Sequence, residues 1–204
     1  MKRLPQYLSD CSPVALAALV LSLLAVPAVS LGNMVPDPAN CIVAPDYGDA
    51  LLVDPGGMPG ATYTITILNS QGLPFPNAYV RIDLDPTLHW CAGASQDAIT
   101  DGNGVCQIEA RAGGCFRGPH AAQVTANGVI IRDYPQVRSP DNASHDIPAA
   151  DGTVAVSDLP YFAEEFTGAA PAGCHDYTND GTVSTSDLPL FADAFKSAIS
   201  CELR

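Results

Sequence analysis

Positive charge is scarce in this chain. Nine lysine and arginine residues stand against 22 aspartate and glutamate residues, so the formal net charge of the 204 residues is −13. Clusters of lysine and arginine, which phosphate binding needs, are missing. The composition therefore excludes nucleic acids and anionic membrane surfaces as expected partners.

The motifs of common catalytic sites are missing too. The sequence has no Gly-x-Ser-x-Gly turn, no His-Glu-x-x-His helix and no glycine-rich phosphate loop. Its densest group of reactive side chains is His89 and Trp90 beside Cys91, which is more typical of packing or surface recognition than of chemistry. We expect a non-catalytic protein, and a small hydrolase or carbohydrate-binding protein built on His89 and Trp90 is the less favoured alternative.

A long apolar run occurs near the N-terminus, over residues 14–29. Lys2 and Arg3 precede it, and it ends in Ala28-Val29-Ser30, which suits signal peptidase. The pattern predicts a secretory signal peptide over residues 1–30, with a retained membrane anchor as the alternative. We therefore expect a secreted protein, extracellular or on the cell surface, with no membrane attachment once the signal is removed.

Cysteine is present without any Cys-x-x-Cys pair, so zinc and redox chemistry are not indicated. Cys11 would leave with the signal peptide. The remaining cysteines are Cys41, Cys91, Cys106, Cys115, Cys174 and Cys201. An even number in a secreted chain indicates disulfides, and fifteen pairings are possible. Their distribution favours Cys174 with Cys201, Cys91 with Cys106, and Cys41 with Cys115.

Two stretches near the C-terminus, residues 151–166 and 180–195, are near-copies of each other. Each begins Asp-Gly-Thr-Val, continues through Ser-Asp-Leu-Pro and ends Phe-Ala-x-x-Phe. This order joins an acidic, glycine-bearing loop to an amphipathic helix, the form of a calcium loop with its exit helix. Ordinary Asp/Gly turns that cap two helices are the alternative.

The second copy fits the twelve-residue calcium frame better. Oxygen donors stand at positions 1, 3, 5, 7, 9 and 12 as Asp176, Thr178, Asp180, the backbone carbonyl of Thr182, Ser184 and Asp187. Gly181 falls at position 6, where the chain turns sharply. Val183 at position 8 is expected to point inward and pair with Val154 of the first copy.

The first copy carries an extra residue before Asp151. Its candidate ligands are Asp146, Asp151, Thr153 and Asp158. Asp141 could replace Asp146 if the loop folds back. Position 9 is an alanine, so we expect weaker calcium binding in this loop than in the second.

Apolar residues recur at helical spacing after each loop. They are Leu159, Phe162, Ala163 and Phe166 in the first copy, and Leu188, Phe191, Ala192 and Phe195 in the second. We expect one apolar face per helix, with the two faces packed together. Calcium and a disulfide would have to reinforce so small a core.

Residues 141–204 resemble a dockerin, the duplicated calcium-binding module of bacterial secreted proteins, on the strength of these loops. The resemblance implies Ca²⁺ as the cofactor and a cohesin-like domain as the protein partner. It also implies that positions 10 and 11 of each loop help to choose that partner, and here these are Val156, Ser157, Thr185 and Ser186. Because the two pairs differ, symmetrical docking in two orientations is not expected.

Residues 31–140 show the alternation of β-strands, in stretches 63–68, 78–84, 105–111 and 121–126. Asn127-Gly128 predicts a tight hairpin. Short strands at this spacing predict a β-sandwich. Residues 58–135 are similar to bacterial Ig-like domains of the invasin type, which implies a spacer, stalk or presentation scaffold.

The predicted fold class is therefore mostly β with a small α C-terminal module: an antiparallel Ig-like β-sandwich followed by a two-helix, dockerin-like calcium-binding domain. The predicted function is attachment or assembly of the Ig-like domain at the cell surface. The alternative is a self-assembling subunit of an extracellular filament or surface layer, in which copies of the chain bind each other and residues 31–40 donate a strand.

Overall fold

The computed structural model describes residues 35–142, 150–197 and 200–203. Contacts divide the chain into two units, Met1–Leu31 and Gly32–Arg204, and the described residues all belong to the second. The predicted signal peptide, Cys11 and Asp146 lie outside the described residues. In the described ranges, no helix has the length and apolar character needed to cross a membrane.

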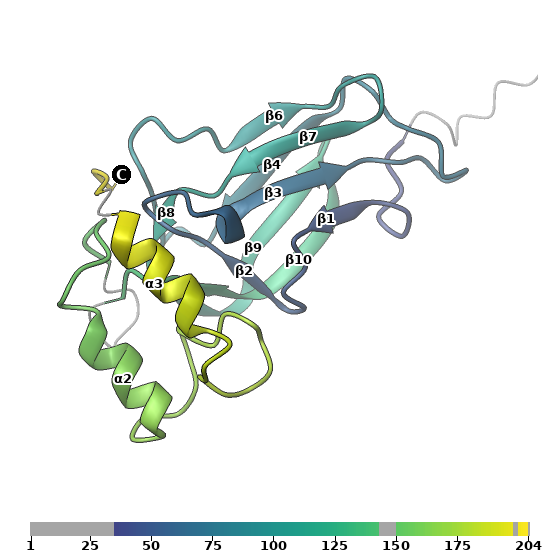
Figure 1. Ribbon diagram of the computed structural model, residues 1–204. Helices are drawn as coiled ribbons and strands as arrows, with labels where there is room; N and C mark the ends of the chain where they lie inside the picture. The colour runs from purple at the N-terminus through teal and green to yellow at the C-terminus, as the bar shows by residue number, and fades with distance from the viewer. Residues whose placement is uncertain (1–34, 143–149, 198–199, 204) are drawn as a thin grey trace, which may run out of the picture. The chain divides into compact units, whose positions relative to one another are not determined.

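The chain is mostly β, with two helices near its C-terminus, as the sequence predicts (Figure 1). In chain order the elements are β1 Ile42–Ala44, β2 Ala50–Leu52, the 3-10 helix η2 Pro59–Ala61, β3 Thr62–Thr66, β4 Tyr79–Leu84, β5 His89–Trp90, β6 Asp97–Ile99, β7 Val105–Glu109, β8 Ala112–Gly113, β9 Phe116–Ala126, β10 Val129–Arg138, α2 Leu159–Thr167 and α3 Leu188–Ser197.

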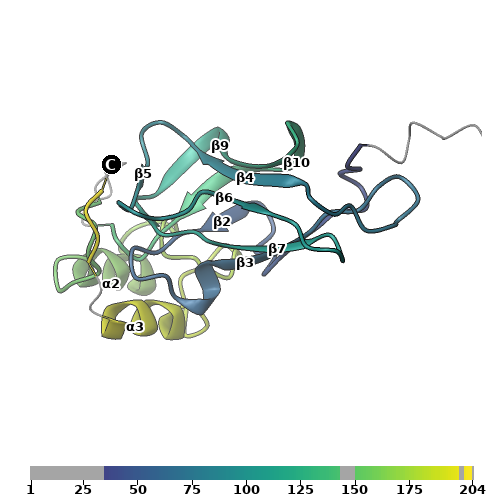
Figure 2. The ribbon, with the colours of Figure 1, turned by 90° about the horizontal axis from the view of Figure 1, so that it is seen from above.

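Two larger sheets and one two-stranded ribbon organise the β part. Their strand orders are β1-β3-β7, β2-β10-β9-β4-β6 and β5-β8. Figure 2 shows β4, β9 and β10 in one layer and β3 and β7 in another. Neighbouring strands are antiparallel except β2 and β10, which run parallel, so the expectation of a wholly antiparallel architecture is wrong for this pair.

Alternation along the strands builds the core between the two larger sheets. Tyr63 and Ile65 of β3 are buried, while the threonines between and beside them stay partly exposed. Val80 and Ile82 of β4 are buried in the same cluster. Period-two patterns place one side of each strand inward, so the sequence locates this core correctly.

The predicted hairpin joins β9 to β10. Asn127 and Gly128 have φ values of 49° and 80°, and Ala126 pairs with Val129 across the turn. Two residues with positive φ give the turn whose twist matches that of the flanking strands.

A second hydrophobic cluster contains the two helices and residues of the β part. Phe162 of α2 and Phe191 of α3 belong to it together with Leu52 and Met58. The rings of Phe162 and Phe191 stack with their centroids 4.6 Å apart. The packing therefore crosses the predicted boundary between residues 140 and 141.

The predicted helix faces are only partly buried. The central phenylalanine of each helix is covered, whereas Leu159 and Leu188 are 45% and 44% exposed and Phe166 and Phe195 are 39% and 38% exposed. The two faces meet through Phe162 and Phe191, as expected, and the apolar residues at the ends of each helix stay partly exposed.

The cysteine pairing differs from all three expected pairs. Cys91 bonds to Cys201 and Cys115 bonds to Cys174, while Cys41 and Cys106 are free thiols. The expected pairs, Cys174 with Cys201, Cys91 with Cys106 and Cys41 with Cys115, are wrong because they assumed that each half of the chain closes on itself. Instead, both disulfides join residues 35–140 to the C-terminal part.

The chain's last described residues explain the first disulfide. Leu203 forms an isolated bridge with Cys91, and the Ala92 N–H donates to the Glu202 carbonyl at 2.7 Å. Cys41 and Cys106, by contrast, belong to segments on opposite sides of β3. Strands two apart in a sheet are separated by roughly 9–10 Å, which is too far for a disulfide.

Peptide mapping of the oxidised protein under non-reducing conditions should find Cys91 linked to Cys201 and Cys115 linked to Cys174. Replacing Cys115 and Cys174 together by serine should lower the free energy of unfolding by about 4 kcal/mol, because this disulfide closes a loop of 59 residues. Urea denaturation measures the change, with Cys41→Ser as a control that should alter stability little. A peptide joining Cys174 to Cys201 would contradict the assignment.

Candidate metal centre

The second loop, residues 176–187, folds around the carboxylate of its first residue. Asp176 is 2% exposed, and its Oδ1 and Oδ2 accept the N–H groups of Asp180 and Gly181 at 3.1 and 3.0 Å. Gly181 has φ +90°, a conformation that costs least without Cβ. The entry half of the loop therefore has the sharp turn that the sequence predicts at position 6.

The carboxylate of its last residue organises the exit half. Asp187 is fully buried, and its Oδ1 accepts both the N–H and the hydroxyl of Thr178, at 2.9 and 3.1 Å. Its Oδ2 accepts the Ser184 N–H at 2.9 Å. Positions 3, 9 and 12 of the predicted frame are thus gathered at one place.

Between them, Asp180 and Thr182 lie at the exposed rim. The hydroxyl and N–H of Thr182 both donate to Asp180 Oδ1, at 2.8 and 2.9 Å. These hydrogen bonds lower the pKa of Asp180. Asp180 therefore carries a full negative charge at neutral pH.

In the first loop, Asp141 takes the entry place. Its Oδ1 and Oδ2 accept the N–H groups of Asp151 and Gly152 at 3.1 and 2.9 Å, and Gly152 has φ +84°. This is the hydrogen-bond pattern of Asp176 in the second loop. The alternative in which the chain folds back to Asp141 therefore describes this loop, whereas Asp146 lies outside the described residues.

The exit half of the first loop also matches the second. Asp158 is fully buried, and it accepts the N–H of Asn142 at 2.9 Å and that of Ala155 at 2.7 Å. At the rim, the Thr153 N–H donates to Asp151 at 2.9 Å. Near-identical sequences thus fold into two loops with corresponding end carboxylates.

The position-8 valines are buried, as predicted, while their direct pairing stays a prediction. Val154 and Val183 are 5% and 6% exposed and belong to the same hydrophobic cluster. The two loops therefore share one hydrophobic cluster with the helices α2 and α3.

Burial of the end carboxylates leaves negative charge in a poorly hydrated place. Asp141, Asp158, Asp176 and Asp187 are each at most 2% exposed. Burial raises the pKa of Asp141 to about 7, with the nearby charges of Asp158 and Asp151 adding to the effect, and burial also raises the pKa of Asp158. Buried carboxylates are stabilised by a cation or a metal.

Arg138, at the end of β10, supplies a positive charge to the second loop. Its side chain is 4% exposed, with Nη1 3.2 Å from Asp176 Oδ2, and Nη2 donates to Asn179 Oδ1 at 2.7 Å. Burial acts to lower the pKa of Arg138, and the charge of Asp176 opposes this. No local sequence pattern marks this arginine, because the contact spans 38 residues of chain.

The donor chemistry of both loops fits a hard cation. Carboxylate, hydroxyl, amide and backbone carbonyl oxygens are the ligands that calcium takes. Within the described ranges, no group of three or more His, Cys, Asp or Glu side chains is close enough to hold a metal ion by itself. The carboxylates of each loop would therefore need the hydroxyl, amide and carbonyl oxygens beside them to complete a site.

The imidazole beside the second loop is held by a carboxylate. His175 is fully buried, with Nδ1 3.1 Å from Glu165 Oε1, and Glu165 also accepts the Gly173 N–H at 2.9 Å. The backbone N–H of His175 donates to Glu165 as well, at 3.2 Å. Burial acts to raise the pKa of Glu165, but the His175 side chain and the two N–H groups outweigh burial and lower this pKa. The sequence did not indicate a buried role for Glu165, since a glutamate next to another glutamate in a helix is expected to be solvent-exposed.

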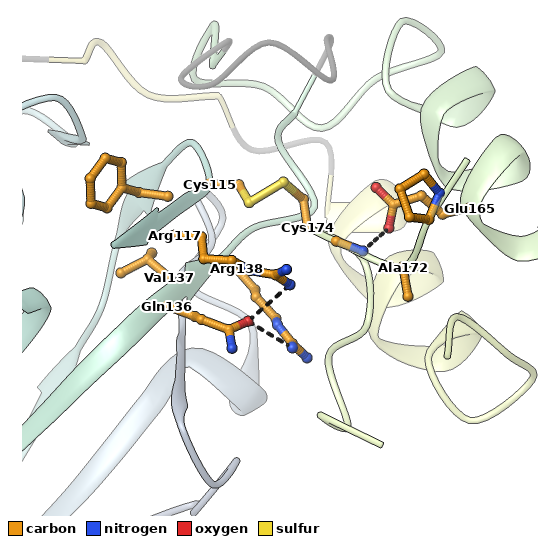
Figure 3. Close-up of a pocket in the computed structure, with 11 residues that line it drawn as sticks. Cys115, Arg117, Gln136, Val137, Arg138, Glu165, Ala172 and Cys174 are labelled. Atoms are coloured by element: carbon orange, nitrogen blue, oxygen red, sulfur yellow. Dashed lines mark hydrogen bonds between the residues drawn. A yellow bond between two sulfur atoms is a disulfide. The ribbon is translucent and has the colours of Figure 1, made fainter. Parts of the chain in front are cut away.

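A pocket of about 240 Å³ borders this region (Figure 3). Arg117 and Arg138 both donate to Gln136 Oε1 on one wall, at 3.3 and 3.0 Å, and Glu165 accepts the Gly173 N–H on the other. Nη2 of Arg138 donates to both Gln136 Oε1 and Asn179 Oδ1, and these two bonds hold the guanidinium beside Asp176.

The residues predicted to choose a partner lie at the surface. Val156 is 70% exposed, and Ser157, Thr185 and Ser186 are exposed as well. Asp158 and Asp187 separate these two pairs from the helices α2 and α3. Their role in binding remains a prediction.

Comparison with known proteins gives no further assignment. No protein-family model matches the chain, and neither the curated proteins nor the solved structures contain a match.

Without metal, the stability of the protein should fall as pH rises from about 4 to about 7. Folding raises the pKa of Asp141 to about 7, from about 3.9 in the unfolded chain, so the folded state binds the proton more tightly in this window. The free energy of unfolding should then drop by at most about 1.4 kcal/mol per pH unit from this group. Thermal unfolding in chelator across pH measures it.

Asp141→Asn should flatten that dependence, because the amide does not titrate. The control is Asp193→Asn, which removes an exposed carboxylate of α3 outside both loops. An unchanged pH profile in Asp141→Asn would show that this carboxylate titrates normally.

Proposed function

We infer that the chain is a secreted, non-catalytic calcium-binding protein in which a dockerin-like module, residues 141–204, attaches an Ig-like β-sandwich, residues 31–140, at the cell surface. The observation that carries this proposal is the pair of loops with matching hydrogen-bond patterns around four buried carboxylates. A helix-capping carboxylate accepts an N–H group from the first turn of its helix, and Asp158 makes no such bond to α2.

The arrangement of the β part supports a scaffold. Two sheets share one core, and two disulfides tie that core to the C-terminal part. Disulfides of this kind suit the oxidising environment outside the cell. A partner bound to the loops and helices would therefore be held at a fixed orientation to the sheets.

A cohesin-like protein is the proposed partner. The exposed pairs before α2 and α3, together with the exposed ends of both helices, offer a surface of polar and apolar groups. An apolar hollow of about 210 Å³ lined by Leu159, Phe191, Ala192, Phe195 and Lys196 lies in this surface. Apolar anchors within a polar rim are typical of protein interfaces.

Self-assembly into a filament or surface layer is the second candidate. The outer strands β1 and β6 carry the exposed residues Ile42 and Ile99, and an uncovered sheet edge can accept a strand from another copy. The proposed donor is less favourable, because Asp37 and Asn40 already hydrogen bond to residues 68 and 69 of their own chain.

Calcium should stabilise the mature protein against heat. At a free concentration about 100 times the dissociation constant, each site adds about 2.7 kcal/mol, which is roughly 5–10 °C in melting temperature for a chain of this size. Differential scanning calorimetry in millimolar calcium and in chelator measures the shift. Magnesium should have a smaller effect, because it demands near-ideal octahedral geometry.

Asp187→Asn should remove the contribution of one loop and leave that of the other. Asp193→Asn, which also removes one carboxylate from the C-terminal part, should keep the full calcium shift. Equal melting temperatures with calcium and chelator in the unmodified protein would refute calcium binding.

The two proposed functions predict different sizes in solution. A docking module should remain a monomer in calcium, whereas a filament subunit should form high-mass material when purified alone. Size-exclusion chromatography with light scattering, in calcium and in chelator, separates them. Calcium-dependent filaments under negative-stain microscopy would favour self-assembly.

A further inference from the structure

Asn142 is a buried amide beside the carboxylates of the first loop. Its side chain is fully buried, and neither Oδ1 nor Nδ2 has a hydrogen-bond partner among the residues that the structure describes. Leaving such a group unpaired costs about 1–3 kcal/mol. Its backbone N–H donates to Asp158 Oδ1 at 2.9 Å, so the residue lies directly against the exit carboxylate.

In the second loop, Thr178 stands beside the exit carboxylate as Asn142 does in the first. Thr178 likewise donates its N–H to Asp187 Oδ1, and its hydroxyl lies 3.1 Å from the same oxygen. Asn142 occupies the corresponding position next to Asp158. The twelve-residue frame could not identify it, because Asn142 directly follows Asp141, whereas one residue separates Asp176 from Thr178.

Asn142 Oδ1 is a hard oxygen donor. Asparagine carbonyls are ordinary calcium ligands beside aspartate carboxylates. The first loop thus has three fully buried side chains, those of Asp141, Asn142 and Asp158. In the described residues, no lysine or arginine forms an ion pair with either of its two carboxylates. A divalent cation would satisfy the amide oxygen and offset both charges.

The second loop starts from a different electrostatic state. Arg138 already lies 3.2 Å from Asp176 and is anchored in the loop through Asn179. A cation that binds there must share Asp176 with a buried guanidinium and works against its positive charge. The affinity of the second loop should therefore be lowered by a residue that belongs to the β part.

We propose that the first loop is the tighter of the two cation sites, with Asp141, Asn142 and Asp158 as ligands, and that Arg138 weakens the second. This inference rests on the proposed calcium binding. It reverses the order expected from the sequence frame, in which the second loop has the fuller set of donors.

Two glycine amides report on the loops separately. The Gly152 N–H donates to Asp141 and the Gly181 N–H donates to Asp176, so each amide senses its own entry carboxylate. Calcium chloride titrated into the ¹⁵N-labelled, oxidised mature chain should shift the Gly152 signal first. We expect its midpoint at a calcium concentration at least about tenfold lower than that of Gly181, a difference of about 1.4 kcal/mol.

The order of these signals decides the proposal without any variant. Gly181 responding first, or both together, would overturn it while leaving calcium binding intact. If neither amide shifts up to millimolar calcium and calorimetry detects no binding heat, the proposed function itself fails.

Reciprocal variants test the ligand. Asn142→Ala should raise the Gly152 midpoint about tenfold or more and leave that of Gly181 unchanged, whereas Thr178→Ala should affect only Gly181. Retained dispersion of the amide spectrum checks that each variant is folded. An unchanged Gly152 midpoint in folded Asn142→Ala would exclude the amide as a ligand.

Arg138→Gln tests the competing charge. It should lower the Gly181 midpoint and bring the two sites closer in affinity, whereas Arg132→Gln, on the same strand but exposed, should change neither. A Gly181 midpoint that stays the same or rises in the folded Arg138→Gln protein would overturn the role of this arginine.

Discussion

Burial of carboxylate groups in two short loops is the constraint on which the C-terminal part depends. Each loop wraps its backbone N–H groups around an entry and an exit aspartate, and these bonds replace the water that the carboxylates lose. Backbone donors satisfy the oxygens but leave the charge largely uncompensated, which raises the pKa of Asp141. The loops therefore require positive charge from elsewhere, whether from a cation or from the rest of the chain.

The rest of the chain meets this requirement unequally. At the second loop, β10 ends in Arg138, which pairs with Asp176, and the adjacent Cys115–Cys174 disulfide holds this loop against the β part. At the first loop, the described residues provide Cys201, whose N–H bonds to the Gly152 carbonyl, but no cationic side chain paired with its carboxylates. Two loops with nearly the same sequence thus acquire different electrostatics from their surroundings.

Much of the local structure could be predicted. The strands β3, β4 and β7, the Asn127-Gly128 hairpin and both helices follow from short-range patterns. The second loop's frame, from Asp176 to Asp187, also predicts which residues come together. Asp141 was only one of two options, because an insertion shifts the frame and local spacing cannot show which aspartate takes the entry place. The disulfides were mispredicted because the pairing depends on where the last residues return to the β part.

The sequence by itself determined the elements and the donor types: alternation sets which strand faces are buried, glycine permits the sharp turn of each loop, and aspartate spacing places oxygen atoms around it. Only the tertiary structure decided the environment of those donors. Packing brings together groups that are distant in the chain: Arg138 contacts Asp176, and Cys91 bonds to Cys201. Packing also buries the side-chain amide of Asn142 away from water. Burial and long-range charge act through space, so they carry no signature in local spacing.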